Sequence, residues 1–270
     1  MVAQSRSEPP LVFIHDWFTD PTAEWAAQGA RFNRDYDCHY FRLAGHGSDP
    51  AETIPPHQPV LDYNIMALQR LLDGLQRPAR LIAHGTGALL ALRIAALVPE
   101  KLNCMILIAP GYRLDRLRWL ARLCTRVPFL LPLYLLFVDP VAVSGQSAWS
   151  RMRARLRCLR GANAALYLRQ GLDAEEPYLA DIRLPVFLIS GDADPLASTR
   201  VAEQLSERLP GSRLLRYGHL GHNPHQTEPE LVNSAMQHFL DAHNKQGPLR
   251  AIGTWLQRVK KLIVGAADSN

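Results

Sequence analysis

The regular alternation of short apolar segments with helical patterns constrains this chain more than any other feature. Six segments have the pattern of strands, several of them apolar on both faces: 11–15, 38–43, 80–84, 104–109, 185–190 and 212–217. Helical patterns lie between them, near 60–76, 87–98, 199–209 and 226–243. Because strands that are buried on both faces need helices above and below them, the order predicts an α/β fold with a mostly parallel sheet flanked by helices.

One region interrupts the alternation. Residues 111–182 show no good strand pattern and are rich in Leu and Arg, which predicts a helical cap inserted into the sheet domain. Ligand sites of such sheets lie outside the carboxyl ends of the strands, where a cap would cover them. We therefore expect a core formed by residues 10–110 and 183–243, with residues 244–270 as a C-terminal helix and tail.

The C-terminal segment 248–265 follows a Gly-Pro break and has the pattern of an amphipathic helix. Its apolar side chains recur at intervals of three and four residues: Leu249, Ile252, Leu256, Val259 and Ile263. Such a helix either packs against the body of the protein or meets a membrane surface or a partner.

Positive charge is concentrated in the predicted cap. Ten arginines and only two aspartates lie between positions 111 and 160, in a chain whose net charge is +5. This block suits an acidic carrier protein, a phosphate-bearing ligand or an anionic membrane, or it forms solvated helix faces. No module that recognises nucleic acid accompanies the arginines, so we expect no nucleic-acid partner. The four cysteines lack close pairing and no secretory signal is visible, which predicts a cytoplasmic protein, with a peripheral position at a membrane as the alternative.

Five motifs follow the strands in a fixed order: "FIHDWF" (13–18), "RLAGHGSDP" (42–50), "AHGTGA" (83–88), "ISGDADP" (189–195) and "GHNPHQTEPE" (221–230). The series resembles the α/β-hydrolase superfamily, in its capped branch of lipase-, esterase- and thioesterase-like proteins, over roughly residues 10–243. The resemblance implies a cap after the sixth strand of the family order, a small acyl or lipid-like substrate, and neither a cofactor nor a metal ion.

The resemblance also implies roles for single residues. Asp194 matches the family's acid and His222 its histidine, and the amides of Trp17 and Thr86 match the oxyanion hole. In this chemistry the imidazole takes the proton of a serine hydroxyl, the carboxylate holds the imidazole, and two amides stabilise the developing oxyanion.

The main departure is Gly85, which stands where the elbow serine is expected and offers no oxygen. Three explanations remain open. The chain is a pseudo-hydrolase that keeps the fold for binding, or it works without a covalent step, or the glycine is an engineered inactivation. In the second case His222 holds a water in the vacated space and acts as a general base, or the same acid–base pair serves a lyase or isomerase reaction. The neighbouring Thr86 is expected to contribute its amide and to point its side chain elsewhere.

Asp16 is the second departure, because the family has glycine after the histidine of the first motif. An ionised carboxylate that pointed into the oxyanion hole would repel an oxyanion. We therefore expect Asp16 either to point outward or to have a raised pKa and to act as an acid.

Overall fold

The computed structural model describes residues 8–17, 19–46, 59–111, 118–130 and 177–244. The chain divides into two compact units, residues 1–233 and 234–270, and the candidate site lies within the first.

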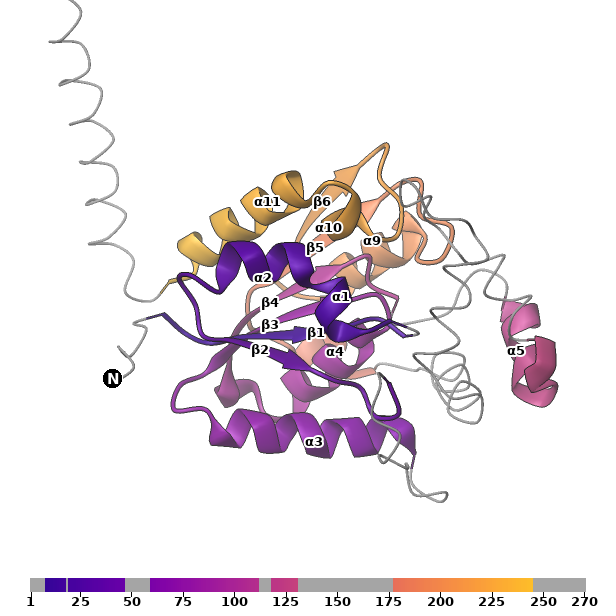
Figure 1. Ribbon diagram of the computed structural model, residues 1–270, viewed down its shortest axis with the longest axis horizontal. Helices are drawn as coiled ribbons and strands as arrows, with labels where there is room; N and C mark the ends of the chain where they lie inside the picture. Colours follow the sequence, from indigo (N-terminus) through magenta and orange to yellow (C-terminus); the bar gives the residue numbers. More distant parts are fainter. Residues whose placement is uncertain (1–7, 18, 47–58, 112–117, 131–176, 245–270) are drawn as a thin grey trace, which may run out of the picture. The chain divides into compact units, whose positions relative to one another are not determined.

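A six-stranded sheet forms the centre of the first unit (Figure 1). Its strands are β1 (Leu11–Ile14), β2 (Cys38–Phe41), β3 (Ala79–His84), β4 (Leu102–Ile108), β5 (Val186–Gly191) and β6 (Arg213–Tyr217). They are arranged in the order β2-β1-β3-β4-β5-β6, and every neighbouring pair is parallel. The predicted fold class is confirmed, and all six predicted strands are present.

Helices cover both faces of this sheet. They include α1 (Pro21–Glu24), α2 (Ala26–Phe32), α3 (Val60–Gly74), α4 (Gly87–Leu97), α9 (Thr199–Arg208) and α10 (Pro224–Thr227), and the 3-10 turn η1 (Pro99–Lys101). Helix α11 (Pro229–Ala242) begins in the first unit and continues into the second. Figure 1 shows α3 and α4 on one face and α2 on the other. Every residue of β1, β3 and β5 is buried, which explains why these strands are apolar on both sides.

The predicted cap lies largely outside the described residues. Its described parts are helical: α5 (Arg118–Arg126) and the 3-10 turns η2 (Pro128–Leu130) and η3 (Pro177–Asp181). The predicted C-terminal helix at 248–265 also lies outside them, so both elements remain predictions. Within the described part of the chain, no helix combines the length and apolarity needed to cross a membrane.

The sheet topology gathers the motifs at one edge. Because all strands are parallel, the segments that follow β1, β3 and β5 emerge together at the carboxyl ends, where the loop after β6 joins them. These segments carry Asp16, Gly85, Asp194 and His222 respectively. Residues far apart in the sequence therefore meet in one site.

Candidate active site

The turn at Gly85 has the geometry of a nucleophile elbow. Gly85 has φ = +54°, the left-handed region that side chains disfavour, between the end of β3 and the start of α4. Two hydrogen bonds between backbone groups connect the turn to the segment around β4: the Gly85 amide donates to the Ile108 carbonyl (3.0 Å), and the Gly111 amide donates to the Gly85 carbonyl (2.8 Å). A Cβ on Gly87 would lie 2.7 Å from the His15 carbonyl oxygen, so a glycine there lets α4 approach β1.

The space beside Gly85 is occupied by the side chain of Asp16. A Cβ built on Gly85 would overlap the Asp16 carboxyl group, and even its more distant oxygen, Oδ2, would lie 2.8 Å away. Position 16 thus supplies a carboxylate to the volume that a side chain at position 85 would fill. The first of the two alternatives predicted for Asp16, an outward orientation, is wrong.

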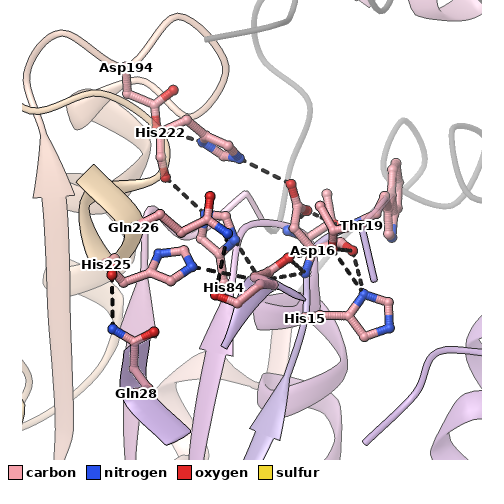
Figure 2. Close-up of polar contacts among 12 residues, drawn as sticks. His15, Asp16, Thr19, Gln28, His84, Asp194, His222, His225 and Gln226 are labelled. Carbon is pink, nitrogen blue, oxygen red and sulfur yellow. Dashed lines mark hydrogen bonds and ion pairs between the residues drawn. The ribbon is translucent and has the colours of Figure 1, made fainter. Parts of the chain in front are cut away.

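The Asp16 carboxylate is held from two sides (Figure 2). Its Oδ1 accepts hydrogen bonds from the Thr86 amide (2.7 Å) and the Thr86 hydroxyl (2.5 Å). Its Oδ2 lies 3.1 Å from Nε2 of His222. The prediction that the Thr86 side chain points elsewhere is wrong, because its hydroxyl binds Asp16.

His222 connects Asp16 to Asp194. Nδ1 of His222 lies 2.8 Å from Oδ2 of Asp194, and both side chains are buried. Asp194 is oriented in turn by the amides of Leu196 (2.7 Å) and Ala197 (3.0 Å), which donate to its Oδ1. The structure therefore brings together the predicted acid and histidine, in a continuous row with Asp16.

The charges of this row follow from its hydrogen bonds. Both ring nitrogens of His222 face carboxylate oxygens, which only accept, so the doubly protonated ring satisfies both contacts. Burial by itself would lower the pKa of His222, but the charge of Asp194 and the hydrogen bond to Asp16 outweigh it and raise this pKa to about 10. Burial would raise the pKa of Asp16, yet the hydrogen bond and charge of His222 bring it well below its usual value. The prediction of a raised Asp16 pKa is therefore wrong.

The two amides predicted for an oxyanion hole both have partners inside the protein. The Thr86 amide donates to Asp16, and the Trp17 amide donates to the Thr86 hydroxyl (3.2 Å). An oxyanion hole in this state holds a carboxyl oxygen of the protein itself. The vacated space that would receive a water beside Gly85 is also filled by Asp16.

A second layer of buried polar groups supports the row. Glu24, at the end of α1, accepts hydrogen bonds from the Asp16 amide (3.1 and 3.3 Å), the Thr19 hydroxyl and Nδ1 of His84 (2.9 Å). Nε2 of His84 donates to the carbonyl oxygen of His222 (2.9 Å). Glu24 thus holds the backbone of Asp16 directly, and it holds the backbone of His222 through His84. Glu24 was not among the predicted site residues, since its only signal in the sequence is its place in the helical turn after the first motif.

Three buried groups lie close enough together to be considered for a metal ion. Ligand atoms of Glu24, His84 and His225 lie within 4.8 Å of one another. A cation there would compete for oxygen and nitrogen atoms of Glu24 and His84 that already make the hydrogen bonds described above. Glu24 and His84 therefore serve as a hydrogen-bonding support of the site, whereas the two buried ring nitrogens of His225 have no hydrogen-bond partner among the described residues.

The parallel sheet, the elbow and the acid–histidine pair define a protein of the α/β-hydrolase class. The chain matches the model of the Alpha/beta hydrolase family over residues 11–235 and belongs to that family.

Curated relatives and solved structures agree with this assignment. The chain is 28% identical to "Putative carbamate hydrolase RutD" of Pseudomonas savastanoi pv. phaseolicola, an alignment that covers 88% of this chain and 96% of the relative. It is 29% identical to the pimeloyl-[acyl-carrier protein] methyl ester esterase of Aromatoleum aromaticum, covering 83% and 95%. A hydrolase from Oleispira antarctica has the same fold, with a TM-score of 0.75 at 18% identity, covering 87% and 91%.

Proposed function

We propose that the protein is a hydrolase of ester or thioester bonds in small acyl or lipid-like substrates, in which His222 and Asp194 form the acid–base pair and no serine takes part. Asp194 holds the imidazole, and His222 carries a proton toward the elbow, where the reacting bond would lie.

One observation carries the proposal. His222 makes the hydrogen bond to Asp194 with Nδ1 (2.8 Å) and turns Nε2 toward the space at Gly85. A protonated imidazole in this position can give its proton to an alkoxide or thiolate as the carbonyl–heteroatom bond breaks. An isolated structural histidine would need neither a buried carboxylate behind it nor an elbow in front of it.

The relatives support an acyl substrate. One is named for a carbamate and another for a methyl ester on an acyl-carrier protein, and both names describe a carbonyl carbon that bears a heteroatom leaving group. The arginine-rich stretch of positions 111–160 would suit an acidic carrier protein or an anionic membrane surface as the place from which the substrate is presented.

A non-catalytic binding role is the second candidate, and one observation favours it. The Asp16 carboxyl group fills the volume of the absent elbow side chain and accepts the hydrogen bond of the Thr86 amide. The site therefore resembles an active site that is already occupied. In this case the protein would hold an acyl or lipid-like ligand, or a partner, without turning it over.

The experiment compares the parent protein with His222→Gln and Asp194→Asn on p-nitrophenyl esters and acyl-coenzyme A thioesters of increasing chain length. The hydrolase proposal predicts turnover in the parent and a loss in kcat/KM of about 100-fold or more in His222→Gln. His243→Gln is the matched control, because His243 bonds to the Phe239 carbonyl in another unit of the chain and should leave turnover unchanged. Equal, background-level hydrolysis in all four proteins, with measurable ligand binding, would support the binding role instead.

A further inference from the structure

We propose that Asp16 is the nucleophile of this site, that its carboxylate forms a covalent acyl intermediate, and that thioesters are the substrate class. The inference rests on the proposed hydrolase function and identifies the nucleophile for it.

The position of Asp16 carries the first step. Its carboxyl group occupies the volume of the absent elbow side chain, and its Oδ2 lies 3.1 Å from Nε2 of His222, where a nucleophile oxygen is required. The side chain keeps 13% of its surface exposed, whereas that of Asp194 is fully buried. Of the two carboxylates that His222 contacts, Asp16 is therefore the one that a substrate can reach.

Acylation then proceeds without a serine. Oδ2 of Asp16 attacks the thioester carbonyl carbon and forms a carbon–oxygen bond as the carbon–sulfur bond breaks. The departing thiolate takes the proton from Nε2 of His222 and leaves as a thiol. The products are a mixed anhydride of Asp16 with the acyl group, and a neutral His222.

The chemistry of a carboxylate selects the substrate class. A carboxylate is a weak base and an excellent leaving group, so a tetrahedral intermediate expels Asp16 again unless the competing group leaves about as readily. An alkoxide leaves far less readily, since its conjugate acid is an alcohol, whereas a thiol has an ordinary pKa of about 8.5. Protonation by His222 assists departure further, and thioesters are therefore favoured over alkyl esters.

The bonds to Thr86 assign the second step. Oδ1 of Asp16 already accepts hydrogen bonds from the Thr86 amide (2.7 Å) and hydroxyl (2.5 Å). These donors would therefore stabilise an oxyanion that forms on Asp16 itself. Neutral His222 takes a proton from a water that attacks Cγ of Asp16, the bond from Cγ to Oδ2 breaks, and the acyl group leaves as a carboxylate. Asp16 keeps the oxygen of the water and releases its proton to solvent.

The route predicts where the oxygen of water ends. Octanoyl-coenzyme A is turned over once by an excess of parent protein in oxygen-18 water, and the peptide that carries Asp16 is sequenced by mass spectrometry. We expect one oxygen-18 atom in the Asp16 carboxyl group. Hydroxylamine, added during turnover, should convert Asp16 to its hydroxamate.

Two variants complete the experiment. Asp16→Asn keeps the size of the side chain but removes the nucleophile, and it should lose both turnover and labelling. Asp35→Asn, which changes an exposed aspartate paired with Arg31, should retain both. Turnover with neither label nor hydroxamate at Asp16 would overturn the nucleophile assignment while the hydrolase proposal stands. No turnover of any ester or thioester by the parent would overturn the hydrolase proposal, and the nucleophile assignment with it.

Discussion

Asp16 and Gly85 occupy one shared volume: the carboxyl group of the first stands where a side chain on the second would begin. The family has a glycine at the first position and the nucleophile at the second, whereas this chain has a carboxylate at the first and a glycine at the second. The two departures from the family pattern are compatible in one sequence because the glycine at position 85 leaves the space that the Asp16 side chain fills.

The shared volume predicts a specific cost for any side chain at position 85. Gly85→Ala should lose about 1–2 kcal/mol of unfolding free energy from its positive φ, and about 1–3 kcal/mol more from overlap with Asp16. Gly211→Ala is the matched control, because Gly211 has φ = +75° and open space around it. Urea unfolding measures both, and equal losses in the two variants would show that Asp16 does not crowd Gly85.

The Thr86 hydroxyl should matter to the rate as well as to the fold. Thr86→Val keeps the backbone amide but removes the hydroxyl that bonds Asp16 and accepts from Trp17. The loss of one oxyanion donor lowers kcat by about 10²–10³-fold in other hydrolases, and we expect a loss of this order with little change in KM. Thr86→Ser should recover most of it. Steady-state kinetics on a thioester decides, and a Thr86→Ser variant as slow as Thr86→Val would point to packing rather than to the hydroxyl.

The contributions of Glu24 and His84 to the free energy of unfolding should be coupled. Glu24→Gln replaces one of the two carboxylate oxygens that accept from His84 and from the Asp16 amide with an amide NH₂, and a loss of about 1–3 kcal/mol is typical when a buried donor loses its acceptor. Since both residues belong to one network, the effects of Glu24→Gln and His84→Asn should not add in the double variant. If the losses of unfolding free energy add in the double variant, the two residues stabilise the protein independently of each other.

The protonated state of His222 predicts an unusual pH dependence. The groups that face its ring are the carboxylates of Asp16 and Asp194 and the rings of His84 and His225, and the two carboxylates dominate. A folded-state pKa of about 10, above the ordinary 6.5, gives stabilisation that is fully present below 6.5 and is lost as the pH rises through about 10.

The pH dependence of kcat/KM should follow the protonation of His222. Because kcat/KM reports the free enzyme, it should stay level across pH 6.5 and fall toward pH 10 as His222 loses its proton. A pH–rate profile of kcat/KM on a thioester checks this. A fall in kcat/KM below an apparent pKa near 6.5 would instead identify a neutral His222 that acts as a base in the free enzyme.

Much of this site was predictable from sequence because its backbone frame follows from order and spacing. The alternating pattern predicts all six strands, and the motifs after them identify Asp194 and His222, which lie within hydrogen-bonding distance. The short helices α1 and α2 were missed, since a run of four residues such as Pro21–Glu24 carries too little periodicity to be recognised.

The partnership of Asp16 with Gly85 could not be predicted in the same way. The sequence shows that both positions depart from the family pattern, but not that β1 and β3 are neighbours placing the two within one volume. The direction of the Asp16 pKa depends on the side chains it meets, and the inward orientation next to His222 reverses the effect expected from burial alone.

The reciprocal exchange tests whether Asp16 stands in the place of the nucleophile. Gly85→Ser alone should fail to react with a fluorophosphonate probe, because the new side chain collides with the carboxylate that holds His222. Gly85→Ser combined with Asp16→Gly restores the arrangement of the family, and the introduced serine of this double variant should be labelled and should hydrolyse p-nitrophenyl esters. If Gly85→Ser alone is labelled as fast as the double variant, Asp16 does not occupy the nucleophile position and its assignment as the nucleophile is wrong.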